Sequence, residues 1–322
     1  MQHNLPTNAP TKCTLTTTDV DQQADNLTNW QQKYDQVSDG CFYGCIDEVA
    51  FNDLQVFKEF TQRALRQQCK VWPNALWLGI PAHSQQSKIN GLSIAENQLM
   101  CRPSDCNFEL ITPEQFNIYG MVINQDALQQ IAQQQGLSLL GITNQGSPRI
   151  TTSHQAVIRA RQCIEQVIYA HGCGASAALQ HDILLNLVLQ LLQSKQPQQK
   201  VTPSYKHRKL VVDRAKEFIV NHPDNVVTIT QLCEFTYVCR RTLQYSFETI
   251  LGINPLRFLR ITRLNQIRRE LSDPQINKPI ATVAANWGFW HPGQFAKDYK
   301  QLFGENPSQT LKRAQLFGRE NL

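Results

Sequence analysis

Two short runs near the carboxyl end of this 322-residue sequence carry side chains that can hydrogen-bond to the edges of nucleic-acid bases. Arg can donate to guanine O6 and N7, and Gln can pair with adenine N6 and N7. The candidate contact residues are Arg240, Arg241, Gln244 and Tyr245 in CRRTLQYSFETIL, and His291, Gln294 and Lys297 in HPGQFAKDYKQLF. On a helix these side chains lie on the face opposite the apolar residues of each run.

The two runs belong to a repeated unit, which spans residues 229–255 and 280–307. With one residue inserted, the matched positions are Leu232 with Val283, Cys233 with Ala284, Leu243 with Phe295, Phe247 with Tyr299, Leu251 with Phe303, Gly252 with Gly304 and Pro255 with Pro307. Each copy predicts a short helix with a small residue at a close crossing, a tight turn, and a second helix with a polar start. This is the pattern of a helix-turn-helix, whose second helix enters the major groove.

A small aromatic core is predicted to hold the second copy together, formed by Trp287, Phe289, Phe295 and Tyr299. Small helix pairs with such cores also serve as plain scaffolds. The duplication favours DNA binding instead, because the copies flank a basic helix over 255–272 that would separate two recognition helices by about one turn of a duplex, roughly 34 Å.

The charge of the chain is uneven. Residues 1–200 carry 13 Lys and Arg against 16 Asp and Glu, whereas residues 201–322 carry 18 against 10, which gives net charges of −3 and +8. A basic segment of this size favours a polyanionic partner.

The length allows two domains, no window approaches 18 apolar residues, and the first 20 residues lack the pattern of a secretory signal. We therefore expect a cytoplasmic protein with reduced thiols and no membrane partner, preceded by a polar, loose leader.

The first half of the chain changes its hydrophobic period along its length. Short apolar and aromatic runs that end at turn-forming residues predict strands over 40–51, 75–81, 97–103, 107–113 and 115–124. Leu54, Phe57, Phe60 and Leu65 predict one helix over 54–69, and a helical period returns over 152–194. Residues 193–209 are polar with two prolines, which is typical of a linker.

Residues 207–317 resemble the DNA-binding domain of the AraC/XylS family of bacterial transcription regulators. The segments RRTLQYSFETILGINPLRFLRITRLNQIRREL and ATVAANWGFWHPGQFAKDYKQLFGENPSQTL carry the resemblance. It implies seven helices, with Arg241, Gln244, Tyr245, His291, Gln294 and Lys297 facing DNA. Two departures are present. Cys239 stands at a helix start where the family usually has Ser or Thr, which are better caps. WHPG places Pro and Gly where many members present side chains, so the second unit is expected to contact mainly phosphate.

The first half is similar to the sensor domains of family members that control catabolic operons, including activators that respond to ethanolamine or to aromatic acids. The segments LTNWQQKYDQVSDGCFYGCIDEVAF and QFNIYGMVIN carry this similarity. It implies an α+β chain with a cupin-like β-barrel sensor, dimerisation helices and an all-α carboxy-terminal domain. The expected organisation is a leader over 1–39, a sensor and dimerisation domain over 40–194, a linker over 195–206 and a DNA-binding domain over 207–317.

Several aromatic and cysteine residues could form other sites, although core packing also explains them. The residues Trp30, Trp72, Trp77 and Tyr119 could line a small-molecule pocket. A metal enzyme would need clustered His and carboxylate ligands, but only His83 lies within 40–123. The thiol-bearing groups Cys41 with Cys45, Cys101 with Cys106, and His171 with Cys173 could form a redox or zinc switch, although core thiols fit their spacing better.

We therefore expect a sequence-specific transcription regulator, an activator of a catabolic operon gated by a small-molecule inducer. Its expected partners are promoter DNA, RNA polymerase, the effector and a second copy of the chain, with no cofactor or metal. Two alternatives are a ligand-independent regulator set by its expression level, and a cupin-type enzyme fused to a DNA-binding module. No catalytic order, P-loop or dinucleotide motif favours an enzyme.

Overall fold

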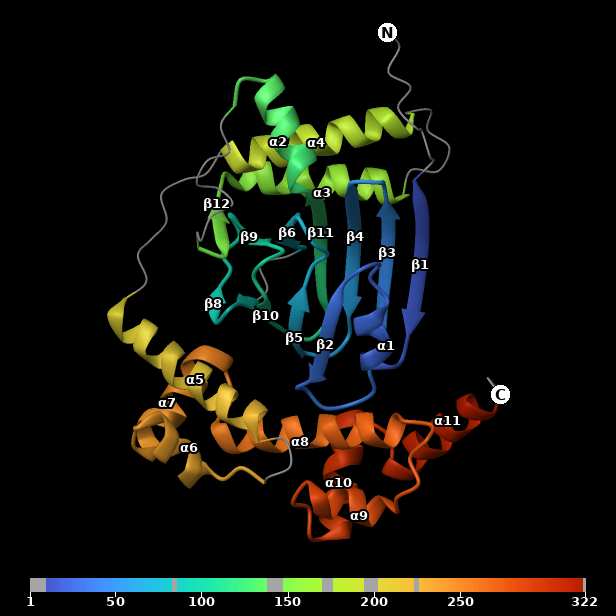
Figure 1. Cartoon of the computed structure of the whole chain (residues 1–322), viewed down its shortest axis with the longest axis vertical. Coiled ribbons are helices and arrows are strands. Elements are labelled where there is room, and N and C mark those ends of the chain that lie inside the picture. Colours follow the sequence, from blue (N-terminus) through green and yellow to red (C-terminus); the bar gives the residue numbers. More distant parts are fainter. Residues whose placement is uncertain are drawn as a thin grey trace. The chain divides into compact units, whose positions relative to one another are not determined.

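The computed structural model describes residues 10–82, 86–137, 147–169, 176–193, 202–222 and 226–320. The chain forms two compact units: unit 1 comprises Met1–Tyr34 and Tyr43–Gln198, and unit 2 comprises Asp35–Phe42 and Gln199–Leu322. Unit 1 contains the strands and unit 2 is helical (Figure 1), which confirms the predicted division into a sheet-rich and an all-α part. The predicted domain limits at 39/40 and 194/195 stay predictions.

The strands form two antiparallel sheets. The larger sheet has the order β1 (Thr11–Thr17), β3 (Gly44–Ala50), β4 (Leu54–Thr61), β11 (Phe116–Asn124), β6 (Ala75–Pro81), β9 (Gln98–Pro103) and β12 (Arg149–Thr151). The smaller sheet has the order β2 (Gln31–Gln36), β5 (Leu65–Lys70), β10 (Phe108–Thr112), β7 (Lys88–Ile89) and β8 (Leu92–Ser93). Within the described residues these remain two sheets, so the expected closed barrel is not observed. Side chains such as Trp77 and Phe108, stacked at 4.4 Å, join them.

The helix predicted over 54–69 is wrong, because this segment forms β4 and β5. Residues at spacings of three fit a helix, but Leu54 and Val56 alternate with Gln55 and Phe57, which is the period of a strand. Phe57 pairs with Gly120 of β11, where a Cβ would overlap the Phe57 ring. Pairing with β11, a non-local interaction, decided the outcome. The five predicted strands all contain observed strands.

Helices α2 (Gln125–Gln134), α3 (His154–Tyr169) and α4 (Ala177–Gln193) pack on one face of the larger sheet. Their buried residues, such as Ile164 and Val188, join one core with Leu54, Val56 and Leu78 of the sheet. The helices predicted over 152–194 are thereby confirmed. The opposite face of the larger sheet is turned toward the smaller sheet.

The polar leader contains regular structure. β1 pairs along its length with β3, and α1 (Val20–Asp25) follows, with the Asp19 side chain accepting hydrogen bonds from the amides of Asp21 and Gln22. The expectation of a loose leader is therefore wrong for residues 11–36. β2 ends this segment, and its last two residues belong to unit 2.

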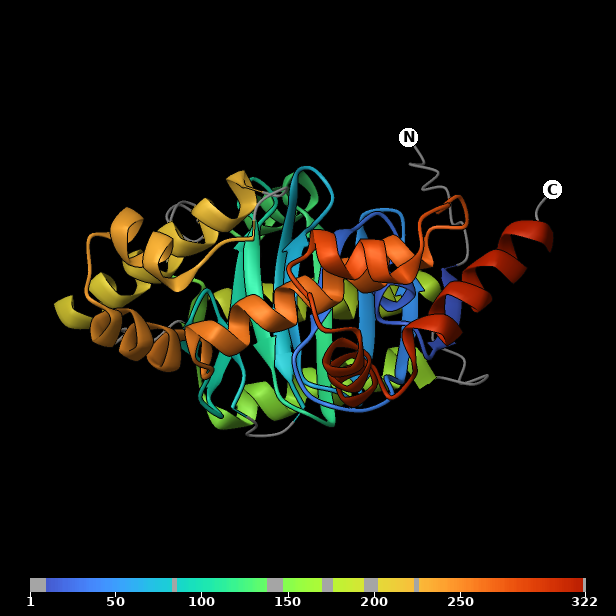
Figure 2. The ribbon, with the colours of Figure 1, turned by 90° about the horizontal axis from the view of Figure 1, so that it is seen from below.

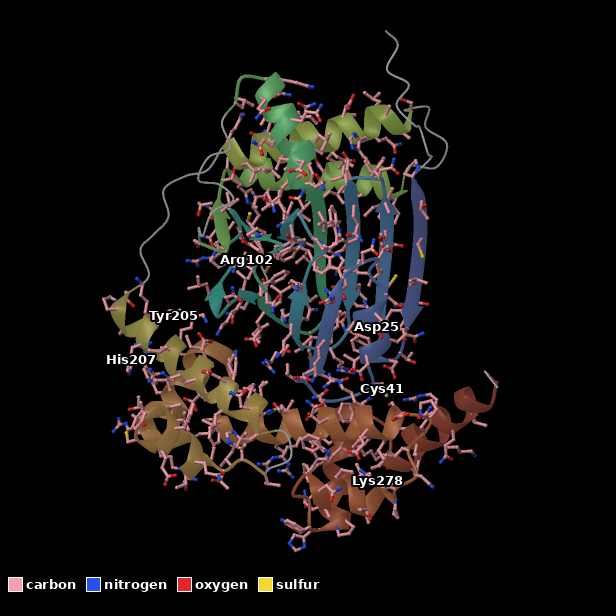
Figure 3. The ribbon with its side chains drawn as sticks, viewed as in Figure 1. Asp25, Cys41, Arg102, Tyr205, His207 and Lys278 are labelled. Atoms are coloured by element: carbon pink, nitrogen blue, oxygen red, sulfur yellow. The ribbon has the colours of Figure 1, made fainter. Side chains whose placement is uncertain are left out.

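Seven helices are found in the described part of unit 2, the number that the resemblance implies. They are α5 (Pro203–Asn221), α6 (Ile229–Thr236), α7 (Arg240–Leu251), α8 (Pro255–Ser272), α9 (Ile280–Asn286), α10 (Pro292–Phe303) and α11 (Pro307–Glu320). The longest of the central helices, α8, runs between the pair α6–α7 and the pair α9–α10 (Figure 2). The side chains of Tyr205 and His207 lie on α5 (Figure 3). Most of the predicted linker lies outside the described residues.

Every helix in the described ranges falls short of the length or the apolar character that crossing a bilayer demands.

Candidate nucleic-acid interface

The first helix-turn-helix consists of α6 and α7. Thr228 caps α6 through a capping box with Gln231, and Tyr237 takes a left-handed conformation (φ 55°) in the turn. Leu243 and Phe247 of α7 are fully buried, while the other face of α7 is solvent-exposed. The turn and the two-sided helix are the geometry that the repeat predicted.

The second helix-turn-helix consists of α9 and α10. Phe295 and Tyr299 are buried in one cluster, against which Trp287 and Phe289 pack, so the predicted aromatic core is confirmed. Gly288 has φ 80° in the turn, and a Cβ there would come within 2.8 Å of the Val226 side chain. This position therefore requires glycine.

The matched ends of the two copies have the same conformation. Gly252 ends α7 with φ 78° and Gly304 ends α10 with φ 73°, both in the left-handed region that favours glycine at a helix terminus. Pro255 and Pro307 then begin the next helices. The structural duplication that the sequence predicted is confirmed.

All seven candidate contact residues are exposed in the structure. Gln244 donates to Glu248 (Nε2 to Oε1, 3.0 Å) and Gln294 donates to Asp298 (Nε2 to Oδ1, 2.7 Å), one turn along each recognition helix. Each bond ties the amide to a carboxylate one turn further along its own helix. A DNA base edge would have to compete with a carboxylate for each amide.

A concave surface of about 1130 Å³ lies between the two recognition helices. Its lining brings together Arg240 and Gln244 of α7, Arg257 and Arg260 of α8, and His291 and Gln294 at the start of α10. Trp290, 72% exposed, also lines it and was not predicted as a contact residue. The sequence analysis placed Trp287 in the aromatic core and assigned no role to Trp290, whose exposure only the structure reveals.

The arginines of α8 differ in their surroundings. Arg257 and Arg260 are exposed, whereas Arg268 is 4% exposed and lies over the Phe303 ring at 5.6 Å. Arg263 donates to the backbone oxygen of Val227. Only part of the positive charge of α8 is therefore available to a polyanion.

The two predicted departures at the helix starts are seen. Neither Cys239 before α7 nor His291 before α10 makes a side-chain capping bond to the backbone. The Cys239 thiol instead lies 3.3 Å from the Thr242 hydroxyl, which helps to lower the pKa of the thiol. Pro292 occupies the first turn of α10, where a missing amide hydrogen costs little.

The four candidate ligand residues separate into two groups. Trp30 and Trp72 both donate to the side-chain oxygen of Gln55, at 2.9 and 3.4 Å, and Trp30 meets Trp77 edge-on at 6.0 Å. Tyr119 lies instead on the helix-covered face of the sheet, where it bonds to Glu165 of α3.

A buried polar cluster near these tryptophans was missed. Glu59 is 3% exposed and accepts hydrogen bonds from Gln23 (3.0 Å) and from the hydroxyl of Tyr34 (3.2 Å). Burial raises the pKa of Glu59 to about 7. Among the buried side-chain atoms of unit 1 that lack a hydrogen-bond partner in the described structure are Gln23 Oε1, Thr61 Oγ1, Gln67 Nε2 and Trp77 Nε1. The alternating polar residues of 55–61 were a signal for this cluster, but the segment was predicted to be a helix and the alternation was not used.

The metal and redox hypotheses gain no support from the geometry. Within the described ranges, His, Cys, Asp and Glu side chains form no group of three that could share a metal ion. The described cysteines have free thiols. Residues His83, His171 and Cys173 lie outside the described residues.

Comparison with known proteins assigns the helical unit. A family model described as a helix-turn-helix domain matches residues 232–313. The chain is 36% identical over 104 residues to the probable thc operon regulatory protein of Rhodococcus erythropolis, covering 32% of this chain and 31% of that protein. It is 34% identical over 105 residues to the XylDLEGF operon transcriptional activator 3 of Pseudomonas putida, covering 32% of each.

The chain belongs to the AraC/XylS family. A solved structure of a probable AraC family transcriptional regulator from Rhodopseudomonas palustris is 33% identical and covers 32% of this chain and 96% of that one, with a TM-score of 0.30. The chain spans about a third of the length of the curated AraC/XylS relatives named above. The matches to those relatives cover about a third of this chain. The residues matched by the family model, 232–313, include both recognition helices.

Proposed function

We propose that this protein is a sequence-specific transcription regulator that binds promoter DNA through α7 and α10 and recruits RNA polymerase as an activator. The observation that carries this proposal is the duplicated helix-turn-helix, whose seven candidate contact side chains are all exposed and which brings four of them, Arg240, Gln244, His291 and Gln294, to one concave surface. A curated relative is named as an operon activator. DNA binding by the two helix-turn-helix motifs requires no catalytic group, so we propose no enzymatic activity.

The interior of unit 1 supports gating by a small molecule. Buried polar atoms without partners cost free energy, about 1–3 kcal/mol each, unless water or a ligand satisfies them. Two unpaired donors (Gln67 Nε2, Trp77 Nε1) and one unpaired acceptor (Gln23 Oε1) accompany the carboxyl of Glu59. A small polar effector with both donors and acceptors fits this set, beside the ring of Trp30.

The exposed face of α4 supports a homodimer. Leu179 and Ile183 lie one turn apart and are 50% and 45% exposed, while the other side of α4 is buried in unit 1. Apolar residues at this spacing form a stripe suited to another helix. A second copy of α4 would cover it.

The roles of the recognition helices can be tested by two substitutions. Gln244→Ala removes no buried group, so the fold should persist, and operator affinity should drop by about 1–3 kcal/mol at one base pair with little effect on nonspecific DNA. Lys297→Ala should weaken binding to all sequences about equally, because the second helix-turn-helix is proposed to contact mainly phosphate.

Competition binding against single-base variants of an operator selected from random DNA measures both effects. Gln315→Ala, an exposed Gln-to-Ala change on α11, is the matched control and should leave both unchanged. A uniform loss for Gln244→Ala together with a base-specific loss for Lys297→Ala would show that the roles are reversed. No effect of either change would contradict the proposed interface.

A further inference from the structure

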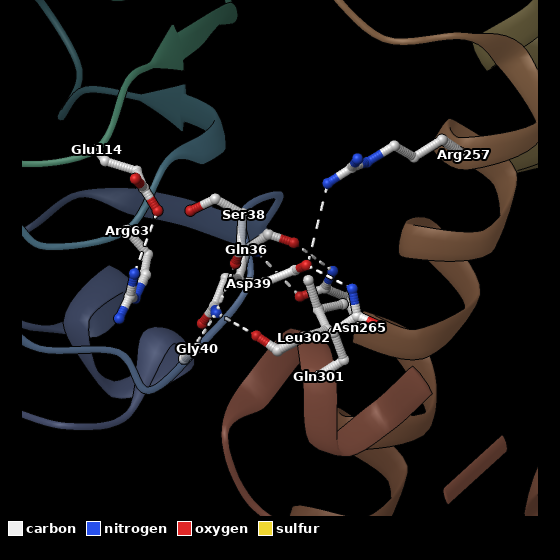
Figure 4. Close-up of polar contacts among 10 residues, drawn as sticks. All are labelled: Gln36, Ser38, Asp39, Gly40, Arg63, Glu114, Arg257, Asn265, Gln301 and Leu302. Carbon is white, nitrogen blue, oxygen red and sulfur yellow. Dashed lines mark hydrogen bonds and ion pairs between the residues drawn. The ribbon is translucent and has the colours of Figure 1, made fainter. Parts of the chain in front are cut away.

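The DNA-binding unit contains eight residues from the first half of the sequence. Asp35–Phe42 belongs to unit 2, where it contacts α8 and the end of α10 (Figure 4). Val37 packs against the same cluster that holds Phe295 and Tyr299. This segment, here called the β2–β3 segment, is therefore packed into the core of the second helix-turn-helix.

Asn265 of α8 is a buried polar residue whose hydrogen-bond partners lie in this segment. It is 1% exposed in the middle of a helix, where Asn is a poor helix former and an unpaired amide would be costly. Its Oδ1 accepts from the amide of Gln36 and its Nδ2 donates to the oxygen of Gln36, both at 3.0 Å. One turn further along α8, Arg269 pairs with Asp35 at 2.9 Å.

The β2–β3 segment also provides hydrogen bonds for the end of α10. The last carbonyl groups of a helix have no partner within the helix. Here the Gln36 side-chain amide and the Gly40 backbone amide both donate to the oxygen of Leu302, and the Gly40 amide also reaches the oxygen of Gln301 at 3.0 Å. Gln301 in turn donates to Asp39 at 2.7 Å.

The close approach continues at the residue after α10. A Cβ placed on Gly304 would overlap the sulfur of Cys41, which lies at the end of the segment (Figure 3). The segment thus contacts α10 through its side chains, its backbone and its packing. A shift of the segment would leave the last carbonyls of α10 without partners.

We propose that the β2–β3 segment fixes the position of α10 and so sets the DNA affinity of the second helix-turn-helix. The segment follows Tyr34 directly in the chain, and the Tyr34 hydroxyl donates to Glu59 in the polar cluster of unit 1. A change at that cluster would act on α10 through one strand, β2. This inference rests on the proposed contact of α10 with DNA.

The test uses the full chain with Gln36→Ala and, as matched control, Gln31→Ala. Both change a Gln of β2, but Gln36 is buried and Gln31 is exposed. Hydroxyl-radical footprinting on a selected operator should show that Gln36→Ala loses protection in the half-site of α10, with affinity reduced about tenfold from the lost hydrogen bonds. Protection in the half-site of α7 and the behaviour of Gln31→Ala should equal the wild type.

A second measurement does not depend on any substitution. If the segment and DNA both favour one position of α10, each must strengthen the other. Hydrogen exchange of the Gly40 amide should therefore become several-fold slower when the wild-type chain binds its operator. Unchanged exchange at Gly40, or an equal loss of protection in both half-sites for Gln36→Ala, would overturn the inference.

Failure of the inference and failure of the proposed function give different results. If Lys297→Ala weakens binding while Gln36→Ala does not, α10 contacts DNA but the segment does not position it. If Lys297→Ala also has no effect, the proposed contact of α10 with DNA is itself wrong.

Discussion

Operator affinity of the full chain is expected to fall by about 10²–10³ between about 50 and 200 mM monovalent salt. Residues 201–322 carry a net charge of +8, and the exposed cations around the concave surface include Arg240, Arg257 and Arg260. Each cation that neutralises a phosphate releases a counterion, so about five such contacts give a loss of this size. Fluorescence anisotropy across a salt series measures the slope.

One substitution calibrates this slope. Lys297→Ala removes one proposed phosphate contact and should reduce the log–log slope by about one. Arg268→Lys is no suitable control, because Arg268 is buried against Phe303. An operator affinity that stays constant from low to moderate salt would show that these cations do not neutralise DNA phosphates.

The second large effect concerns Glu59. The pKa of this carboxyl is about 7 in the folded chain against 4.5 for an unperturbed glutamate, because burial disfavours its charged form. The folded state then binds the proton more tightly than the unfolded state. The contribution of Glu59 to the free energy of unfolding should therefore be fully present below about pH 4.5 and fall by about 3 kcal/mol as the pH rises to about 7.

Glu59→Gln isolates this contribution, since glutamine keeps the size of the side chain but does not titrate. Urea unfolding of both proteins, followed by tryptophan fluorescence, gives the free energy of unfolding at each pH. The stability of the wild type relative to Glu59→Gln should fall by about 3 kcal/mol as the pH rises from about 4.5 to about 7. Parallel curves for the two proteins would show that Glu59 is ionised normally and that the interior is not the polar site proposed here.

The repeat in unit 2 could be predicted because its determinants are local. Gly252 and Gly304 are needed at left-handed helix ends, and Pro255 and Pro307 begin the helices that follow. These residue types report backbone conformation directly, and two copies confirm each other. The positions and exposure of all seven candidate contact residues follow from the same periodicity.

Unit 1 was harder to predict because its determinants are non-local. Leu54, Phe57 and Phe60 fit a helix and a strand equally well until β11 is known to pair with them. The barrel implied by the resemblance is two sheets in the structure, joined through side chains such as Trp77. Spacing along the chain does not report which strands pair.

The role of the β2–β3 segment had almost no sequence signal. Val37, Ser38, Asp39 and Gly40 are typical of an exposed turn, and the partners of Val37, Asp39 and Gly40 on α8 and α10 lie more than 200 residues away. One hint exists in Asn265, a polar residue on the buried side of a helix. Such a residue indicates a buried partner but does not identify it.

We propose that the two recognition helices, held apart by helix α8, bind one face of the same duplex. The most direct measurement is the affinity of the full chain for operators with 5 or 10 base pairs inserted between the two half-sites. The 18 residues of α8 span only about 27 Å and cannot stretch. Both insertions should reduce affinity to that of a single half-site, at least about tenfold below the native spacing. Equal affinity for the native and the lengthened operators would contradict the claim.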